Sequence, residues 1–184
     1  MTMTKPIVRV PNPVLTTLAK PITRFDRKLA RLVATMKTTL RATKNPKGVG
    51  LAAPQIDESL RVFVTKPWDK DAIRVFINPE IIKRSLEETD GVPERDKKLE
   101  GCLSIPNIWG KVKRAASVTL RFQDETGATH EEEFSGFLAT IIQHETDHIN
   151  GKLFTHRVLE QKGKLYQPGK DKEGKEILEE LKLR

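Results

Sequence analysis

The sequence predicts an α+β protein in which small antiparallel sheets pack around one central, buried helix. Three observations favour this class. A helix predicted near residues 136–149 is apolar over much of its circumference, which is typical of a helix enclosed by other elements. Short β-rich segments precede it and end at turn residues. A single amphipathic helix lies nearer the N-terminus, and the chain has no internal repeat.

The first predicted helix spans residues 26–42. Its apolar side chains recur with helical spacing and form one stripe: Leu29, Leu32, Val33, Met36 and Leu40. Asp26 stands just before the stripe and is a candidate N-cap, because its carboxylate can accept the free backbone N–H groups of the first turn. The other face is basic, with Arg27, Lys28, Arg31, Lys37, Arg41 and Lys44. A loop with Asn45, Pro46 and Gly48 is expected to end the helix.

Strands are expected at residues 61–64 and 74–77, the second ending at Asn78-Pro79. Residues 87–98 are polar and are interpreted as an exposed loop. Residues 117–134 are predicted to form a hairpin. Apolar and polar side chains alternate in the segment before residues 124–127, and those four residues are typical of a turn.

The second predicted helix runs from about Gly136 to Ile149, and Asn150-Gly151 is a good C-terminal stop, since both residues tolerate left-handed backbone angles. Beyond Glu160 the chain is rich in Lys and Glu, with a weak helical pattern at residues 177–181. We therefore expect one domain over residues 1–166. A charged C-terminal tail over residues 167–184 would follow, with a short helix as its candidate structure.

The composition limits the function classes. A chain of 184 residues suits one globular domain, and a single cysteine, Cys102, excludes an internal disulfide framework. No apolar run approaches the roughly 20 residues that cross a bilayer, and the N-terminus lacks the apolar core of a signal peptide. We expect a cytoplasmic monomer that does not bind membranes. The net charge of +8 is uneven, because residues 1–50 carry eleven Lys or Arg and one acid, a local net of +10.

The second helix carries the pattern H-E-x-x-H at His144, Glu145 and His148. Residues at i and i+4 lie one above the other on a helix, so both imidazoles can bind one metal ion. Glu145 lies one step round the helix, where it can take a proton from a water on that ion. The competing interpretation is two helix histidines satisfied by hydrogen bonds, which the apolar helix face disfavours because unpaired imidazoles there would be costly.

A third protein ligand is needed, and the sequence offers several. A zincin-type metallopeptidase of the extended H-E-x-x-H class would place a histidine at position 154, which is Phe154, and His156 comes two residues late. A related class uses a downstream glutamate, for which Glu160 or Glu173 would serve. The better candidate is Cys102, which follows Gly101 in the segment Glu100–Ser104, because glycine lets the backbone approach the ion closely.

Three segments, in this order and spacing, resemble the peptide deformylase family: Gly48–Gln55, Glu100–Ser104 and Gln143–Gly151. The likeness extends from about Ile7 to Phe154. The resemblance implies an enzyme that hydrolyses the N-formyl group from the initiator methionine of nascent polypeptides and releases formate.

The resemblance also implies the role of each site residue. Cys102, His144 and His148 would hold the ion, with a water in the fourth position. Glu145 would receive the proton of this water and later pass one to the departing amine. The side-chain amide of Gln55 and the backbone N–H of Leu103 would face the formyl oxygen as it becomes negative, as oxyanion donors do.

The substrate-binding residues follow from spacing and from the glycines. Phe137 and Ile141 precede His144 by seven and three positions and share its helix face, so they are candidates for the methionine pocket, with Val49 approaching from the loop. Gly50 and Gly101 would let a substrate strand lie against the backbone. Ordinary core packing is the alternative for the apolar residues. Asp147 is expected either to accept a hydrogen bond from a ligand or to anchor the helix, and a plain surface acid is the alternative.

One thiolate and two imidazoles suit Zn²⁺, Fe²⁺, Co²⁺ or Ni²⁺, and the resemblance favours Fe²⁺. The expected partners are N-formyl-methionyl nascent peptides. The basic face of residues 27–44 is a candidate ribosome contact through RNA phosphates, and a solvated helix face is the alternative.

Overall fold

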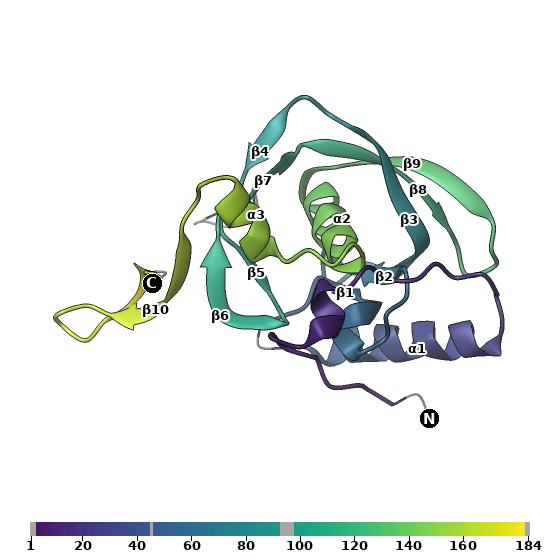
Figure 1. Cartoon of the computed structure of the whole chain (residues 1–184), viewed down its shortest axis with the longest axis horizontal. Helices are drawn as coiled ribbons and strands as arrows, with labels where there is room; N and C mark the ends of the chain where they lie inside the picture. The colour runs from purple at the N-terminus through teal and green to yellow at the C-terminus, as the bar shows by residue number, and fades with distance from the viewer. Residues whose placement is uncertain (1–2, 45, 93–97, 183–184) are drawn as a thin grey trace.

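The computed structural model describes residues 3–44, 46–92 and 98–182. Over these residues the chain has an α+β fold with three α-helices, two 3-10 turns and three antiparallel sheets (Figure 1). Among the described residues, no helix has the length and apolar character that crossing a bilayer requires. The helices are α1 (Arg27–Ala42), α2 (Gly136–Ile149) and α3 (Phe154–Glu160), and the 3-10 turns are Pro13–Thr16 and Ala53–Ile56.

The largest sheet has five strands in the order β1-β2-β3-β8-β9. A four-stranded sheet has the order β11-β10-β6-β5, and β4 pairs with β7. The strands of the first sheet are β1 (Gly50–Ala52), β2 (Val62–Thr65), β3 (Arg74–Arg84), β8 (Ser117–Gln123) and β9 (Thr129–Ser135). The others are β4 (Glu88–Asp90), β5 (Glu100–Cys102), β6 (Ile105–Gly110), β7 (Lys113–Ala115), β10 (Leu165–Lys170) and β11 (Glu176–Glu180).

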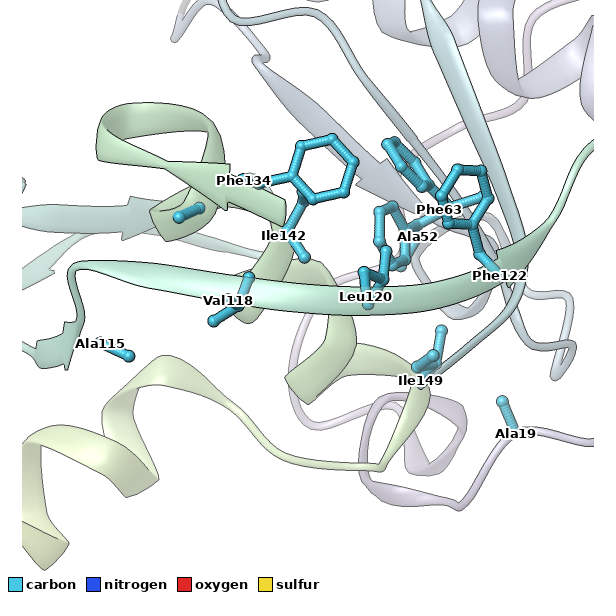
Figure 2. Close-up of a cluster of buried hydrophobic side chains, with 12 residues drawn as sticks. Ala19, Ala52, Phe63, Ala115, Val118, Leu120, Phe122, Phe134, Ile142 and Ile149 are labelled. Carbon is cyan, nitrogen blue, oxygen red and sulfur yellow. The ribbon is translucent and has the colours of Figure 1, made fainter. Parts of the chain in front are cut away.

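The five-stranded sheet separates two apolar layers, because successive side chains of a strand point to opposite faces. On one face, Phe63 and Phe76 pack with Ile142 of α2. Figure 2 shows side chains of this cluster converging from the sheet and from α2. On the other face, Val62 and Val64 pack against the apolar stripe of α1. The sheet therefore holds α2 on the side away from α1, and ten of the α2 residues are buried.

Three sequence predictions agree with the structure. Asp26 caps α1, and its Oδ1 accepts hydrogen bonds from the backbone N–H groups of Lys28 at 2.8 Å and Leu29 at 3.1 Å. Strands β8 and β9 form the expected hairpin. The second helix has the expected bounds, from Gly136 to Ile149.

Two predictions between these elements are wrong. The strand expected to end at Asn78-Pro79 continues to Arg84, because residues 80–84 also pair with β8. The pairing shifts register between Ile77 and Glu80, where Asn78 adopts a left-handed φ of 49°. The Asn78 amide also bonds both backbone groups of Ile22, which holds the irregular strand in place. The predicted exposed loop at 87–98 contains strand β4 and the buried Val92. Residues 93–97 of that loop, and Asn45 of the earlier one, lie outside the described residues.

The C-terminal segment is a β-hairpin, so the helix expected there is wrong. Strands β10 and β11 pair with each other, and β10 continues onto β6 through Tyr166 and Trp109 (Figure 1). Asp171 shapes the turn, since its Oδ1 accepts from the backbone N–H groups of Glu173 and Lys175, both at 2.9 Å. A free strand edge on β6 thus outweighs a weak helical propensity. Strand β10 begins at Leu165, so it crosses the expected boundary between domain and tail.

Substituting Leu165 by alanine tests whether this hairpin is docked on the body of the protein. Leu165 is buried in a cluster with Val158, and Leu181 packs against the cluster. We expect the substitution to lower the free energy of unfolding by about 2–3 kcal/mol, measured by urea denaturation. Leu86→Ala is the matched control, because Leu86 is fully exposed and should change stability by less than about 0.5 kcal/mol. Equal effects of the two substitutions would contradict the docked hairpin.

Candidate metal centre and active site

A pocket of about 380 Å³ opens between α2, strands β5 and β6, and the segment that leads into β1. Both polar and apolar side chains line it. The polar side chains include Gln55, Glu100, Cys102, His144 and Glu145. A concave apolar cavity with a few converging polar groups is the usual form of an active site.

Three side chains at or just behind the pocket lining can bind one metal ion. Cys102 comes from β5, while His144 and His148 come from adjacent turns of α2. One ligand atom from each residue lies within 4.8 Å of the others, and Cys102 Sγ is 3.2 Å from His148 Nε2. His148 is buried behind the pocket and Cys102 is also buried, so both ligands are protected from solvent.

The chemistry of these groups fits a divalent transition metal. His144 Nδ1 lies 2.6 Å from Glu100 Oε1, so Nε2 is the ring nitrogen that can face an ion, as in carboxylate–histidine–metal arrangements. His148 Nδ1 has no hydrogen-bond partner among the described residues, while its Nε2 faces the sulfur. Burial opposes ionisation of the Cys102 thiol, but the imidazoles of His148 and His144 lower its pKa to about 5. A thiolate and two imidazoles form the ligand set of a zinc or iron site.

Glu145 has the properties of a proton acceptor. Its side chain is buried, and Oε2 has no hydrogen-bond partner among the described residues. Burial raises the pKa of Glu145 to about 7, near the value that suits proton transfer at neutral pH. Oε1 lies against Gly50, where an added Cβ would come within 2.3 Å of it. Only glycine at position 50 therefore leaves room for this carboxylate.

Gln55 is held with its amide N–H group directed into the site. The 3-10 turn Ala53–Ile56 brings the side chain back, so that Oε1 accepts a hydrogen bond from the Ala52 N–H at 2.9 Å. Nε2 then lies 3.6 Å from Cys102 Sγ and 3.3 Å from Ser104 Oγ. The donor end of the amide is thus fixed beside the candidate ligands.

The remaining predicted residues meet at the same pocket. Leu103 lines it directly after Cys102. The five residues predicted to bind substrate also line it: Val49, Gly50, Gly101, Phe137 and Ile141. The sequence-predicted site residues therefore come together, with His148 enclosed behind the pocket wall.

A buried ion-pair network behind the candidate metal ligands could not be predicted from the sequence. Arg114 of β7 donates to both carboxylate oxygens of Glu100, at 2.8 and 2.7 Å, and to Asp147 Oδ2 at 3.0 Å. Asp147 also accepts from Arg157 at 2.6 Å. Asp147 is therefore a buried anchor of α2 and not a surface acid. Burial opposes ionisation of Glu100, but the Arg114 guanidinium holds the pKa of that carboxyl well below its usual range.

Replacing Arg114 by methionine should destabilise the protein strongly. The substitution leaves Glu100 and Asp147 buried with less compensating charge, so we expect the free energy of unfolding to fall by about 3 kcal/mol in urea denaturation. Arg121→Met is the control, because Arg121 forms exposed pairs with Glu131 and Glu80 and should change stability by less than about 1 kcal/mol. If both variants lost a similar amount of free energy of unfolding, the buried ion pairs would stabilise the protein no more than the exposed ones.

The other candidate third ligands lie elsewhere. His156 Nδ1 accepts a hydrogen bond from the Leu153 N–H at the start of α3. Glu160 is exposed and pairs with Arg157 and Lys152, and Glu173 is exposed in the turn between β10 and β11. None of them belongs to the three-residue group of possible metal ligands found among the described residues. The geometry thus favours Cys102 over the ligands of either metallopeptidase class.

Comparison with known proteins gives a consistent result. A family model described as polypeptide deformylase matches residues 4–164. The chain is 41% identical over 157 residues to a peptide deformylase from Mesorhizobium japonicum, covering 84% of each chain. It is 41% identical over 159 residues to one from Dictyoglomus thermophilum, covering 86% of this chain and 95% of that protein.

Solved structures agree with this result. The crystal structure of a peptide deformylase from Thermotoga maritima matches with a TM-score of 0.75 and 35% identity, covering 84% of this chain and 97% of that one. A class I type b peptide deformylase from Acinetobacter baumannii, with Met-Ala-Ser bound, matches with a TM-score of 0.75 and 33% identity, covering 85% and 99%.

Proposed function

Since the chain belongs to the peptide deformylase family, we propose that its Cys102, His144 and His148 centre hydrolyses the N-formyl group of the initiator methionine. The enzyme is a metallohydrolase that acts on nascent polypeptides and releases formate. The observation that carries the site assignment is that these three ligands lie together beside a pocket that Glu145 and Gln55 line. In this proposal α2 is the central helix of the fold, and its H-E-x-x-H motif supplies two ligands and the acid–base group.

The metal is proposed to be Fe²⁺, and Zn²⁺, Ni²⁺ or Co²⁺ would also suit one thiolate and two imidazoles. When bound, such an ion acts as a Lewis acid and lowers the pKa of water toward neutrality. Metal analysis of protein purified without oxygen tests the identity. With Fe²⁺ beside the Cys102 thiolate, activity should fade in air, whereas a Zn²⁺ enzyme should keep it.

Glu145 is proposed to move the protons of the reaction. Its carboxylate takes a proton from the attacking water and passes one to the nitrogen of the leaving methionine amine. The pKa raised by burial suits both steps, because the group can hold a proton and also release it near pH 7. Enclosure of Glu145 against Gly50 keeps it in one position throughout.

Gln55 and Leu103 are proposed to stabilise the negative charge that develops on the formyl oxygen. The Gln55 Nε2 group is already directed into the site and its amide orientation is fixed by Ala52, so no reorganisation is needed. The Leu103 N–H would supply the second donor. Preorganised donors of this kind contribute on the order of 3 kcal/mol each to the transition state.

The methionine side chain is proposed to bind among Phe137, Ile141 and Val49, with Gly50 and Gly101 lying along the substrate backbone. These residues line the same cavity as the polar groups, and core packing alone does not account for their position at its surface. Gly101 packs against the Trp109 ring, where an added Cβ would come within 3.0 Å of ring atom Cδ1. A larger residue at position 101 would therefore push this wall of the pocket outward.

The test is release of formate from a short formyl-methionyl peptide by protein purified without oxygen. We expect release that a chelator abolishes and that Fe²⁺ or Ni²⁺ restores. Cleavage of unformylated peptides without any formate release would overturn the proposal in favour of a metallopeptidase.

The basic face of α1 is proposed to contact ribosomal RNA, where substrates emerge, with the enzyme acting as a cytoplasmic monomer. Arg27, Arg31 and Arg41 are exposed and form no ion pair with the described residues. Their charges are therefore available to phosphates, whose attraction weakens steeply with salt.

Co-sedimentation with ribosomes at low and high salt tests this contact. Changing Arg27, Arg31 and Arg41 to glutamate should abolish binding at low salt. The matched control changes Lys170, Lys172 and Lys175 of the C-terminal hairpin to glutamate, which alters the net charge equally. If both triple variants lost ribosome binding equally, the loss would be due to net charge alone. That result would contradict a specific contact through α1.

A further inference from the structure

The turn between β2 and β3 packs against the outer side of the proposed methionine pocket. The Lys66 N–H donates to the Val49 carbonyl at 2.7 Å, and Lys47 Nζ lies 2.5 Å from Asp69 Oδ2. The Trp68 ring lies 5.4 Å from the Phe137 ring, at an interplanar angle of 53°. Lys47, Val49 and Phe137 all line the pocket, so this turn supports three of its wall residues from behind.

Trp68 is held in a defined position although the residue is 48% exposed. Its backbone N–H donates to Asp71 Oδ2 at 3.0 Å, which closes the turn. The indole gains aromatic packing from its contact with the Phe137 ring.

Phe137 has the pocket on one side and the indole on the other. It is the second residue of α2 and follows Gly136, whose left-handed φ of 60° starts the helix abruptly. Its ring is half-buried, and the Trp68 indole occupies space directly beside it. The indole is therefore placed to limit how far the Phe137 ring can move.

We propose that Trp68 is a positioning residue that sets which first side chain the enzyme accepts, by holding the Phe137 ring in the pocket wall. This inference rests on the proposed function of the pocket. With the indole in place, the pocket fits an unbranched methionine side chain and excludes larger ones. Without it, the ring swings outward and the pocket widens.

The expected result is a change in discrimination between substrates. Trp68→Ala should lower the ratio of kcat/KM for a formyl-methionyl peptide to that for a formyl-phenylalanyl peptide by about 10-fold, since small changes in an apolar pocket have effects of this size. The loss should arise mainly from a higher KM for the methionyl peptide, with kcat nearly unchanged. Trp68→Phe should keep the wild-type ratio, because a phenyl ring still blocks the outward movement of Phe137.

Measuring both substrates on one preparation makes the ratio independent of metal content and of the fraction of active enzyme. Leu86→Ala is the control, because it removes another exposed apolar side chain that does not line the pocket. Circular dichroism of each variant checks folding, and if Trp68→Ala does not fold, Trp68→Leu takes its place. A double variant tests whether Trp68 acts through Phe137. In the Phe137→Leu protein, removing the Trp68 side chain should have no further effect on the ratio of kcat/KM values.

The outcomes separate this inference from the function on which it rests. No formate from any formyl peptide with the wild-type enzyme would overturn the proposed function itself. An active wild type whose ratio is unchanged by Trp68→Ala would overturn the role of Trp68 alone. A phenylalanine variant that behaves like the alanine variant, or an equal effect in the Phe137→Leu background, would overturn the mechanism through Phe137.

Discussion

Replacing Glu145 by glutamine is expected to lower kcat for formate release by about 10³-fold, within the range that general acid–base groups contribute. Glutamine has almost the same shape, so it fits beside Gly50, but it cannot accept a proton from water or return one to the amine. The metal ligands are untouched, so metal content and KM should stay close to those of the wild type. Steady-state kinetics and metal analysis on the same preparation measure both quantities.

A matched carboxylate-to-amide change controls for this prediction. Glu133 lies on β9, where its carboxylate accepts a hydrogen bond from the Ser117 hydroxyl at 3.1 Å, and it does not line the pocket. Glu133→Gln should therefore retain full activity. If Glu145→Gln kept more than about a tenth of the wild-type kcat, proton transfer through Glu145 would be ruled out as an important step.

Replacing Cys102 by alanine is expected to remove both the metal and the activity. The two imidazoles of α2 are not a complete site, because zinc and iron centres of this type need three protein ligands. The substitution removes the one donor that β5 contributes, and with it the thiolate that His148 and His144 favour. We expect protein that folds but contains essentially no bound metal by elemental analysis, with formate release at background.

The same measurement distinguishes the metallopeptidase alternative. Glu160→Ala and Glu173→Ala should keep the full metal content, since both glutamates lie outside the three-residue group. The reverse pattern, in which Cys102→Ala keeps its metal and a glutamate variant loses it, would contradict the proposed ligand set. Thermal unfolding of each variant, with and without a chelator, tests whether it is folded. A cooperative unfolding transition shows that a loss of metal is not caused by a failure to fold.

Elements with a strong local signal were predictable. The stripe of α1 and the N-cap Asp26 follow from contacts within one or two helical turns, which the order of residues dictates directly. The hairpin of β8 and β9 follows from alternation around a turn. Strands that form only by pairing with a segment distant in the sequence were missed or predicted wrongly. Strand β4 depends on β7, and the C-terminal hairpin depends on the open edge of β6.

In the candidate site, too, some residues could be identified from the sequence and others could not. The sequence alone placed His144, Glu145 and His148 on one helix, because helical spacing brings i and i+4 to the same face. It singled out Cys102 by composition, as the only thiol in the chain.

Tertiary structure decided the rest. Cys102 meets His148 across 46 residues of sequence, and Arg114 pairs with Asp147 across 33. Local periodicity carries no information about contacts at these separations, because such contacts form only when the whole chain folds and excludes water. Packing also buries Glu145 and so raises its pKa, and it places Trp68 behind Phe137. The sequence therefore determined which groups could do the chemistry, and the folded structure determined their neighbours, their charge and the shape of the space between them.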